Sequence, residues 1–195
     1  PVTELVTGID LVKEQINVAN NGKLSFNQDD IKIKGDAIEC RIYAEDPDSN
    51  FMPSTGELKS SRVPAGPGVT VDSGVVEGSM IPVYYDPMIS KLCTWGATRV
   101  EAIDRMKRAL SEYRICGVST AIAFHETVMN HEVFVRGDLS THFIADHLDG
   151  QSVLLSSSAV ADMSQNLTRS GDGLLVVAYD PLTIHHHMRN ACRVP

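Results

Sequence analysis

Apolar residues recur at helical spacing in three segments of the chain, and this pattern predicts three helices. The segments run from Thr7 to Ala19, from Thr98 to Tyr113 and from Thr120 to Met129. In the second segment Thr98 and Glu101 stand three residues apart, which is the spacing of a capping box at a helix N-terminus. The predicted apolar stripe of this helix is formed by Val100, Ile103, Met106, Leu110 and Tyr113.

Other segments alternate between apolar and polar residues, which predicts β-strands. The clearest runs from Ala37 to Ala44, where apolar residues alternate with Glu39, Arg41 and Tyr43. Because successive side chains of a strand point to opposite faces, this strand should have one apolar face and one polar face. Further strands are predicted over residues 31–34, 57–60, 69–72 and 88–95.

These elements together predict an α+β fold with a mainly antiparallel sheet and packed helices. Clusters rich in Pro and Gly separate the strands and are typical of turns. From about Gly150 the pattern weakens, although Leu174 to Ala178 could form one strand. We interpret residues 149–195 as a poorly patterned tail.

Composition and charge narrow the function classes for this chain of 195 residues. The net charge of −8 argues against nucleic acid as the main partner, because phosphate binding needs clustered Lys and Arg. No apolar stretch is long enough to predict a membrane span. The four cysteines lie far apart without a CxxC pair, so no zinc site is expected. Sparse cysteines favour a reducing compartment over secretion, and we expect a cytoplasmic protein, although a mitochondrial matrix is equally compatible with this pattern. The adjacent residues His185–His187 cannot readily converge on one ion, so we expect no metal site.

Five sequence blocks, in the same order, resemble blocks of the biotin carboxylase family. They are Pro1–Leu11, Ala37–Pro47, Phe51–Gly56, Tyr84–Leu92 and Gly137–Phe143. The sequences of these blocks are most similar to those of the biotin carboxylase subunits of acetyl- and propionyl-CoA carboxylases. The resemblance implies that residues 1–30 are the end of an ATP-grasp domain and that residues 31–148 form the biotin carboxylase C-terminal domain.

The resemblance also implies a reaction and residues that serve it. Biotin carboxylases are ligases that carboxylate biotin with ATP and bicarbonate. The family's arginine that stabilises negative charge on biotin matches Arg41, and Asp86 matches an Asp that we expect to orient Arg41 as its ion-pair partner. Thr141 matches a position that lies near the adenine of ATP in the family.

Most of the family's catalytic residues precede the position of Pro1. ATP and Mg²⁺ would therefore be bound mostly upstream, while biotin would arrive on a separate carrier domain. The implied partners are the upstream ATP-grasp lobe, the biotin carrier domain, a second copy in a full-length homodimer, and a carboxyltransferase subunit. The chain, which starts at Pro1 and not at Met, resembles a fragment and is expected to be inactive alone.

The same residues also have simpler structural interpretations. Arg41 and Glu39 could form an ordinary ion pair on a solvated sheet face, and Asp86 could be a turn residue. Tyr84 and Tyr85 are interpreted as packing residues. His125 and His131 are interpreted as half-buried or capping residues. The alternative function is a non-catalytic docking or oligomerisation module for a partner subunit of a carboxylase. A third interpretation is a truncated, partly folded product.

Overall fold

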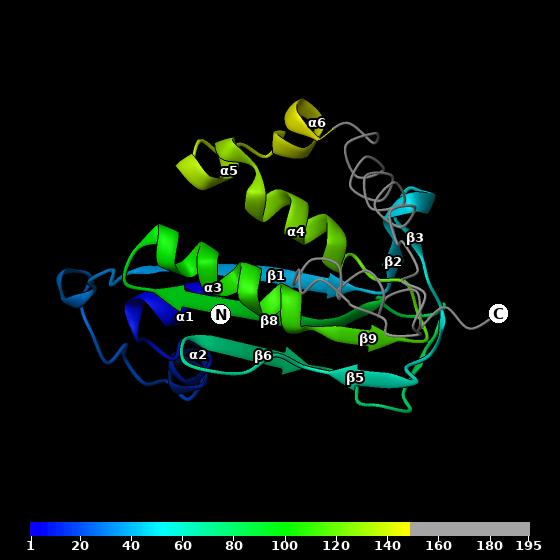
Figure 1. Ribbon diagram of the computed structural model, residues 1–195. Helices are drawn as coiled ribbons and strands as arrows, with labels where there is room; N and C mark the ends of the chain where they lie inside the picture. Colours follow the sequence, from blue (N-terminus) through cyan, green and yellow to red (C-terminus); the bar gives the residue numbers. More distant parts are fainter. Residues whose placement is uncertain (149–195) are drawn as a thin grey trace, which may run out of the picture.

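A three-stranded antiparallel sheet lies at the centre of the computed structural model, which describes residues 1–148 (Figure 1). Its strands are β1 (Asp36–Tyr43), β8 (Met88–Gly96) and β6 (Val69–Ser73), in the order β1-β8-β6. Strand β8 is in the middle and is antiparallel to both neighbours. Short two-stranded ladders extend from this sheet, and the whole arrangement confirms the α+β prediction.

The short ladders pair segments of two or three residues. They are β2 (Glu45–Asp46) with β3 (Met52–Pro53), β4 (Gly56–Glu57) with β7 (Met80–Ile81), and β5 (Ser60–Arg62) with β9 (Arg114–Cys116). Two 3₁₀ turns, η1 (Gln28–Asp30) and η2 (Pro47–Ser49), complete the loops.

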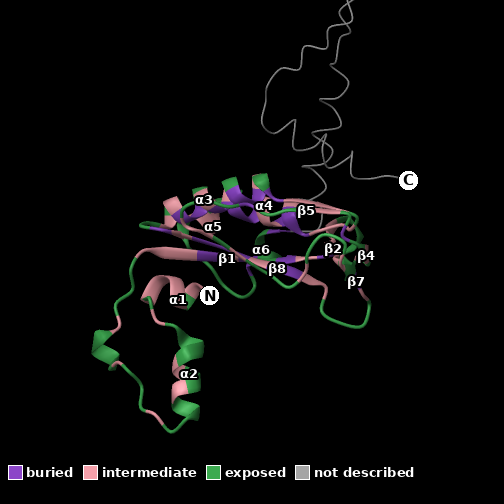
Figure 2. Ribbon diagram, turned by 90° about the horizontal axis from the view of Figure 1, so that it is seen from below, coloured by how far each residue is buried: buried purple, intermediate pink, exposed green. Residues whose placement is uncertain are grey.

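Helices lie on both sides of the main sheet (Figure 2). Helices α3 (Arg99–Glu112) and α4 (Ile122–Asn130) are on one side, and α1 (Val2–Thr7) is on the other. The remaining helices are α2 (Leu11–Ala19), α5 (Glu132–Arg136) and α6 (Phe143–His147). None of the helices within residues 1–148 has the length and apolar character needed to cross a membrane.

The core lies between the sheet and helices α3 and α4. The predicted alternation in β1 is confirmed, because Ile38, Cys40, Ile42 and Ala44 are all buried. Strand β8 adds Leu92, which has no exposed surface. Helix α3 adds the buried residues Ala102, Ile103, Met106, Ala109 and Leu110. These apolar contacts supply the main driving force for the fold.

Polar groups inside this core are paired. The Thr94 hydroxyl donates a hydrogen bond to the Ala102 carbonyl oxygen (2.9 Å), and the Ser90 and Tyr113 hydroxyls share a hydrogen bond of 2.8 Å. Each bond joins β8 to α3 or to its C-cap. A buried hydroxyl without a partner would destabilise the fold, so these two bonds fix the position of α3 on the sheet.

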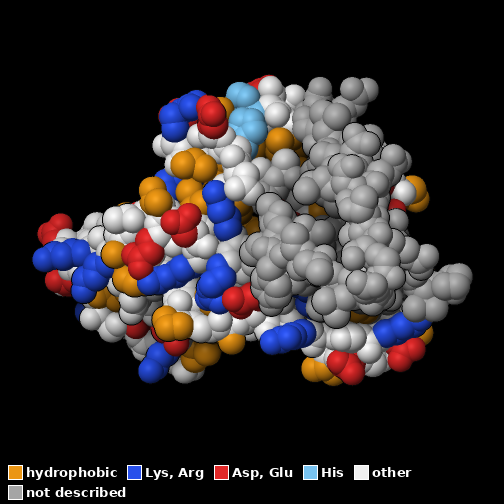
Figure 3. Space-filling model, in the orientation of Figure 1, with side chains coloured by type: hydrophobic (Ala, Val, Ile, Leu, Met, Phe, Trp, Pro, Cys, Tyr) orange, Lys and Arg blue, Asp and Glu red, His pale blue; other side chains and the backbone are white. Residues whose placement is uncertain are grey.

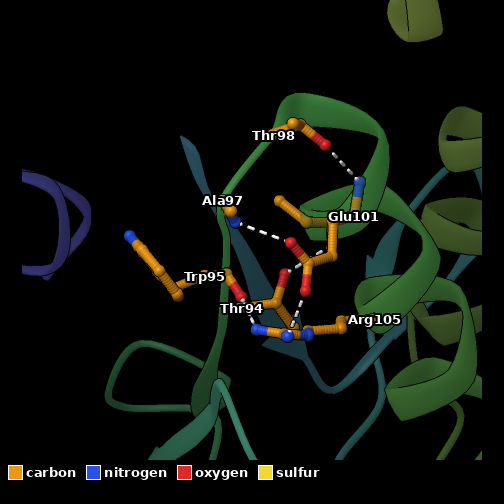
Figure 4. Close-up of polar contacts among 7 residues, drawn as sticks. Thr94, Trp95, Ala97, Thr98, Glu101 and Arg105 are labelled. Atoms are coloured by element: carbon orange, nitrogen blue, oxygen red, sulfur yellow. Dashed lines mark hydrogen bonds and ion pairs between the residues drawn. The ribbon is translucent and has the colours of Figure 1, made fainter. Parts of the chain in front are cut away.

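The start of α3 is capped as the sequence predicts (Figure 4). The Thr98 hydroxyl accepts a hydrogen bond from the Glu101 amide (3.3 Å). The Glu101 carboxylate accepts from the Ala97 amide (2.7 Å), and its other oxygen pairs with Arg105, which also donates to the Trp95 carbonyl. These contacts tie the first turns of α3 to the end of β8.

Several predicted elements differ from the structure. The helix predicted from Thr7 begins at Leu11, because Gly8 takes a left-handed conformation (φ 71°) that ends α1, and Asp10 then caps α2. Residues 31–34 form no strand, since no neighbouring strand pairs with them. Val100 is 59% exposed, so the apolar stripe of α3 starts one turn later.

The central position of Leu92 gives a stability prediction. Leu92→Ala should lower the free energy of unfolding by about 2–5 kcal/mol, because it leaves a cavity between the sheet and α3. Urea denaturation followed by circular dichroism measures this change. The control Val100→Ala, at an exposed position, should stay within about 0.5 kcal/mol of the wild type. Equal losses in the two variants would contradict the placement of the core.

Candidate functional site

Charged side chains gather on the face of the sheet opposite α3 and α4. The register places Arg41 of β1 opposite Lys91 of β8, and Lys91 is in turn opposite Asp72 of β6. Glu39 is opposite Cys93 in the same way. Because alternate residues of a strand share a face, these five side chains belong to one face. We call this face the polar sheet face.

Arg41 is held at two points, one on its side chain and one on its backbone. Its Nε donates to Glu39 Oε1 (3.2 Å), and its backbone carbonyl accepts a hydrogen bond from His125 Nε2 of α4 (2.9 Å). Its side chain is nevertheless 58% exposed. A hydrogen bond with the Tyr43 side chain and then the pair with Glu39 raise the pKa of Arg41. Arg41 therefore presents a permanent positive charge to solvent.

The side chain of Glu39 is 18% exposed, against 58% for its partner Arg41. Its Oε2 lies 3.1 Å from the amine of Pro1 and accepts from the Cys93 thiol (3.8 Å). Burial acts to raise the pKa of Glu39, but hydrogen bonds from Pro1 and Arg41 outweigh it and lower the pKa. Burial raises the pKa of Cys93 to about 11, so the thiol keeps the proton that it donates.

Asp86 does not form the predicted ion pair with Arg41. Among the ion pairs of residues 1–148, Arg41 is joined to Glu39, and Asp86 takes no part in one. Asp86 Oδ1 instead accepts from the Met88 amide (2.9 Å) in the turn before β8, as the plainer interpretation expects. Burial, and then the charge of Asp86, raise the pKa of Glu45.

The other predicted residues lie apart from Arg41 or in unexpected surroundings. Thr141 is exposed in the turn before α6. Tyr84 and Tyr85 are 87% and 81% exposed, so their interpretation as packing residues is wrong. His131 caps α5 by accepting from the Val133 amide (3.3 Å), as predicted.

The described residues offer no metal centre, because no three His, Cys, Asp or Glu side chains among them converge. His185–His187 and the predicted strand over 174–178 lie outside the described residues. On the face seen in Figure 3, Lys and Arg side chains lie interspersed with Asp and Glu. The described part therefore places its clearest candidate chemistry at Arg41.

The backbone bond from His125 to Arg41 is a contact that the sequence pattern did not reveal. Glu39 was named only as a possible surface partner. The spacing of two residues between Glu39 and Arg41 was a local signal for their pairing. The contact with His125 spans 84 residues, and no local signal could have found it.

Comparison with known proteins identifies the family that the chain resembles. The sequence model of the family described as biotin carboxylase C-terminal domain matches residues 39–146. The chain is 56% identical over 144 residues to Biotin carboxylase 1 of Bacillus subtilis, a match that covers 74% of this chain and 32% of that protein. It is 49% identical over 146 residues to the biotin carboxylase of Nostoc sp., which covers 75% and 33% respectively.

A solved structure gives the same result. The biotin carboxylase domain dimer of Hydrogenobacter thermophilus 2-oxoglutarate carboxylase, in complex with MgADP, ADP and bicarbonate, is 41% identical with a TM-score of 0.73. The match covers 75% of this chain and 32% of that chain. The chain therefore spans about a third of the length of the proteins that it matches.

The bond from His125 to Arg41 predicts a dependence of stability on pH. Burial lowers the pKa of His125, so the folded state resists the proton that the unfolded chain accepts near pH 6.5. The contribution of His125 to stability is therefore complete above about pH 6.5 and is lost as pH falls below it. Urea denaturation at several values between about pH 7 and pH 5 should show a smaller loss in His125→Gln than in the wild type.

The chain contains other histidines, so the comparison needs a matched control. His142 is exposed, and His142→Gln should preserve the difference that His125→Gln removes. A pH dependence that is the same in His125→Gln and in the wild type would argue against a neutral His125.

Proposed function

Because the chain belongs to the biotin carboxylase C-terminal domain family, we propose that it forms the biotin-side wall of the active site in a biotin carboxylase. In this proposal residues 31–148 are the C-terminal domain and residues 1–30 are the end of the ATP-grasp domain. The enzyme would carboxylate biotin with ATP and bicarbonate.

The exposed guanidinium of Arg41 carries this proposal. Biotin supplies a ureido group, whose oxygen gains negative charge when the neighbouring nitrogen loses its proton. A fixed positive charge beside that oxygen stabilises this state. Arg41 stays charged and offers donors in a planar fork, and its Nε is already held by Glu39. Lys91, directly across on β8, adds a second positive charge to the same face.

The proposal assigns ATP and Mg²⁺ to the rest of the enzyme. The relatives are about three times as long as the matched region, and the described residues contain no cluster of metal ligands. In this chain we propose Arg41 as the main site residue. Asp86, in the turn before β8, is the second residue proposed. We propose that a biotin carrier domain, a second copy and a carboxyltransferase subunit complete the assembly.

A chimera tests the role of Arg41. The C-terminal third of Bacillus subtilis Biotin carboxylase 1 is replaced by this chain, and bicarbonate-dependent ATP cleavage is measured with free biotin. The chimera should be active, while the chain alone should not be. Arg41→Ala should lower biotin-dependent turnover by about 10²-fold, with little change in the KM for ATP, because the stabilising charge is lost.

Two further variants sharpen this test. Arg41→Lys keeps the charge but loses the fork of donors, so its turnover should fall between those of Arg41→Ala and the parent chimera. Arg62→Ala removes an exposed arginine of β5 and should have no effect. If the Arg41→Ala chimera turned over biotin as fast as the parent chimera, the proposed function would be wrong.

An apolar groove beside α2 supports the second candidate function, a docking module. Leu11 and Val18 of α2 line this groove with Leu24 and Phe26 of the following loop. Val18 is 49% exposed and Leu24 is 56% exposed. Exposed apolar groups that lie together are typical of surfaces that another protein segment covers. The partner proposed here is the preceding part of a biotin carboxylase.

Val18→Asp should weaken docking at this groove by about tenfold or more, because a charge would be buried against apolar groups. The measurement is titration calorimetry of the chain with the separately expressed preceding part of Bacillus subtilis Biotin carboxylase 1. Val100→Asp places the same charge at an exposed position on α3 and is the control. Absence of binding by the wild-type chain, or equal binding by all three proteins, would exclude docking through this groove.

A further inference from the structure

We propose that Glu39 is the positioning residue for Arg41, a role that rests on the proposed function of Arg41 and deepens it. The resemblance to the family led us to expect Asp86 in this role, but the geometry points to the carboxylate two residues before Arg41. Both side chains lie on the polar sheet face of β1, where residues two apart are neighbours. Glu39 would act through Arg41 and would not touch biotin.

Glu39 binds Arg41 through Nε, and this choice of atom suits an arginine that binds a substrate. Glu39 Oε1 accepts from Arg41 Nε at 3.2 Å. An arginine has five N–H donors, and only one of them is on Nε. Glu39 therefore constrains the direction of the guanidinium plane through Nε and leaves the donors of the two terminal nitrogens available to other partners.

Glu39 can hold this orientation because it is itself fixed. Its second oxygen accepts from the Cys93 thiol across the strand pair. Only 18% of its side chain is exposed, against 58% for Arg41. Because both oxygens of this largely shielded carboxylate accept hydrogen bonds, Glu39 has less freedom to change rotamer than a surface carboxylate has. The backbone of Arg41 is held independently by His125.

Stability alone does not explain this contact. The pair of Arg108 with Glu112 on α3 is a surface ion pair of the ordinary kind, with side chains 41% and 47% exposed. Such pairs contribute little to folding because solvent screens them. The pair of Glu39 with Arg41 differs because one partner is half-buried while the other projects into solvent. This difference in exposure between the two partners suits an arginine that presents its charge to a ligand.

The neighbouring carboxylates face other groups. Asp86 Oδ1 is occupied by the Met88 amide, and Asp86 acts with burial to raise the pKa of Glu45. Asp72 is opposite Lys91 and not opposite Arg41. Among the described residues, Glu39 is thus the carboxylate that forms an ion pair with Arg41.

The first experiment observes the contact directly in the full chain. Nitrogen-15 NMR resolves the Nε–Hε group of each arginine, and a hydrogen bond to a carboxylate slows the exchange of Hε with water. Glu39→Ala should speed the exchange of Arg41 Hε by about tenfold or more, and Glu39→Gln, whose amide oxygen still accepts, should speed it less. The control Glu112→Gln should leave Arg41 Hε unchanged.

The second experiment measures the consequence in the chimera with Bacillus subtilis Biotin carboxylase 1. Glu39→Gln should raise the KM for free biotin or lower kcat/KM for biotin by about tenfold, without the same change in the KM for ATP. Glu112→Gln should match the parent chimera. A merely structural loss would impair both substrates together, so the split between biotin and ATP distinguishes a positioning role.

The outcomes separate this inference from the proposed function. If Arg41→Ala impairs biotin turnover but Glu39→Gln and Glu39→Ala do not, then Glu39 does not position Arg41 although the proposed function stands. If Arg41→Ala leaves turnover intact, the proposed function is wrong, and the inference about Glu39 loses its functional basis. Unaltered Hε exchange in Glu39→Ala would overturn the inference whether or not the chimera is active.

Discussion

The antiparallel pairing of β1 with β8 is the constraint on which the rest of the structure depends. One register places Cys40 opposite Leu92, under α3, and also places Arg41 opposite Lys91 on the polar sheet face. Because side chains alternate with a period of two, a slip by one residue would move the apolar set into solvent and the charges into the core. The burial of the apolar face therefore fixes the position of Arg41 without any contact to a substrate.

The same strand pair also explains how the core and the candidate site are joined. Strand β1 is at the edge of the main sheet, so its outer carbonyl groups need partners. Helix α4 and its cap supply them, since the Ala121 amide donates to the Tyr43 carbonyl and His125 donates to the Arg41 carbonyl. The helix that covers the core thus also closes the edge of the strand that bears Arg41. Loss of packing at α4 would disturb the site through the backbone.

Local pattern accounts for part of this arrangement. The alternation in β1 and the capped, amphipathic α3 could be read from neighbouring residues, and the structure confirms both. The helix predicted from Thr7 failed because one left-handed glycine divides it, and periodicity does not detect backbone conformation. Tyr84 and Tyr85 are apolar enough to suggest packing, yet within residues 1–148 no core lies beside their turn. Asp86 was expected to pair with Arg41 on the basis of resemblance, whereas in the structure its Oδ1 accepts from the Met88 amide of its own turn.

The distribution of charge on the polar sheet face adds to the argument from Arg41. Like charges that are directly opposite in neighbouring strands destabilise a sheet, yet Arg41 is opposite Lys91. Glu39 on one side and Asp72 on the other reduce this repulsion without placing a carboxylate between the two cations. A sheet face under selection for stability alone would alternate its charges across the strands. The register instead places two cationic residues opposite each other, and an oxygen with negative charge bound beside Arg41 would relieve their repulsion.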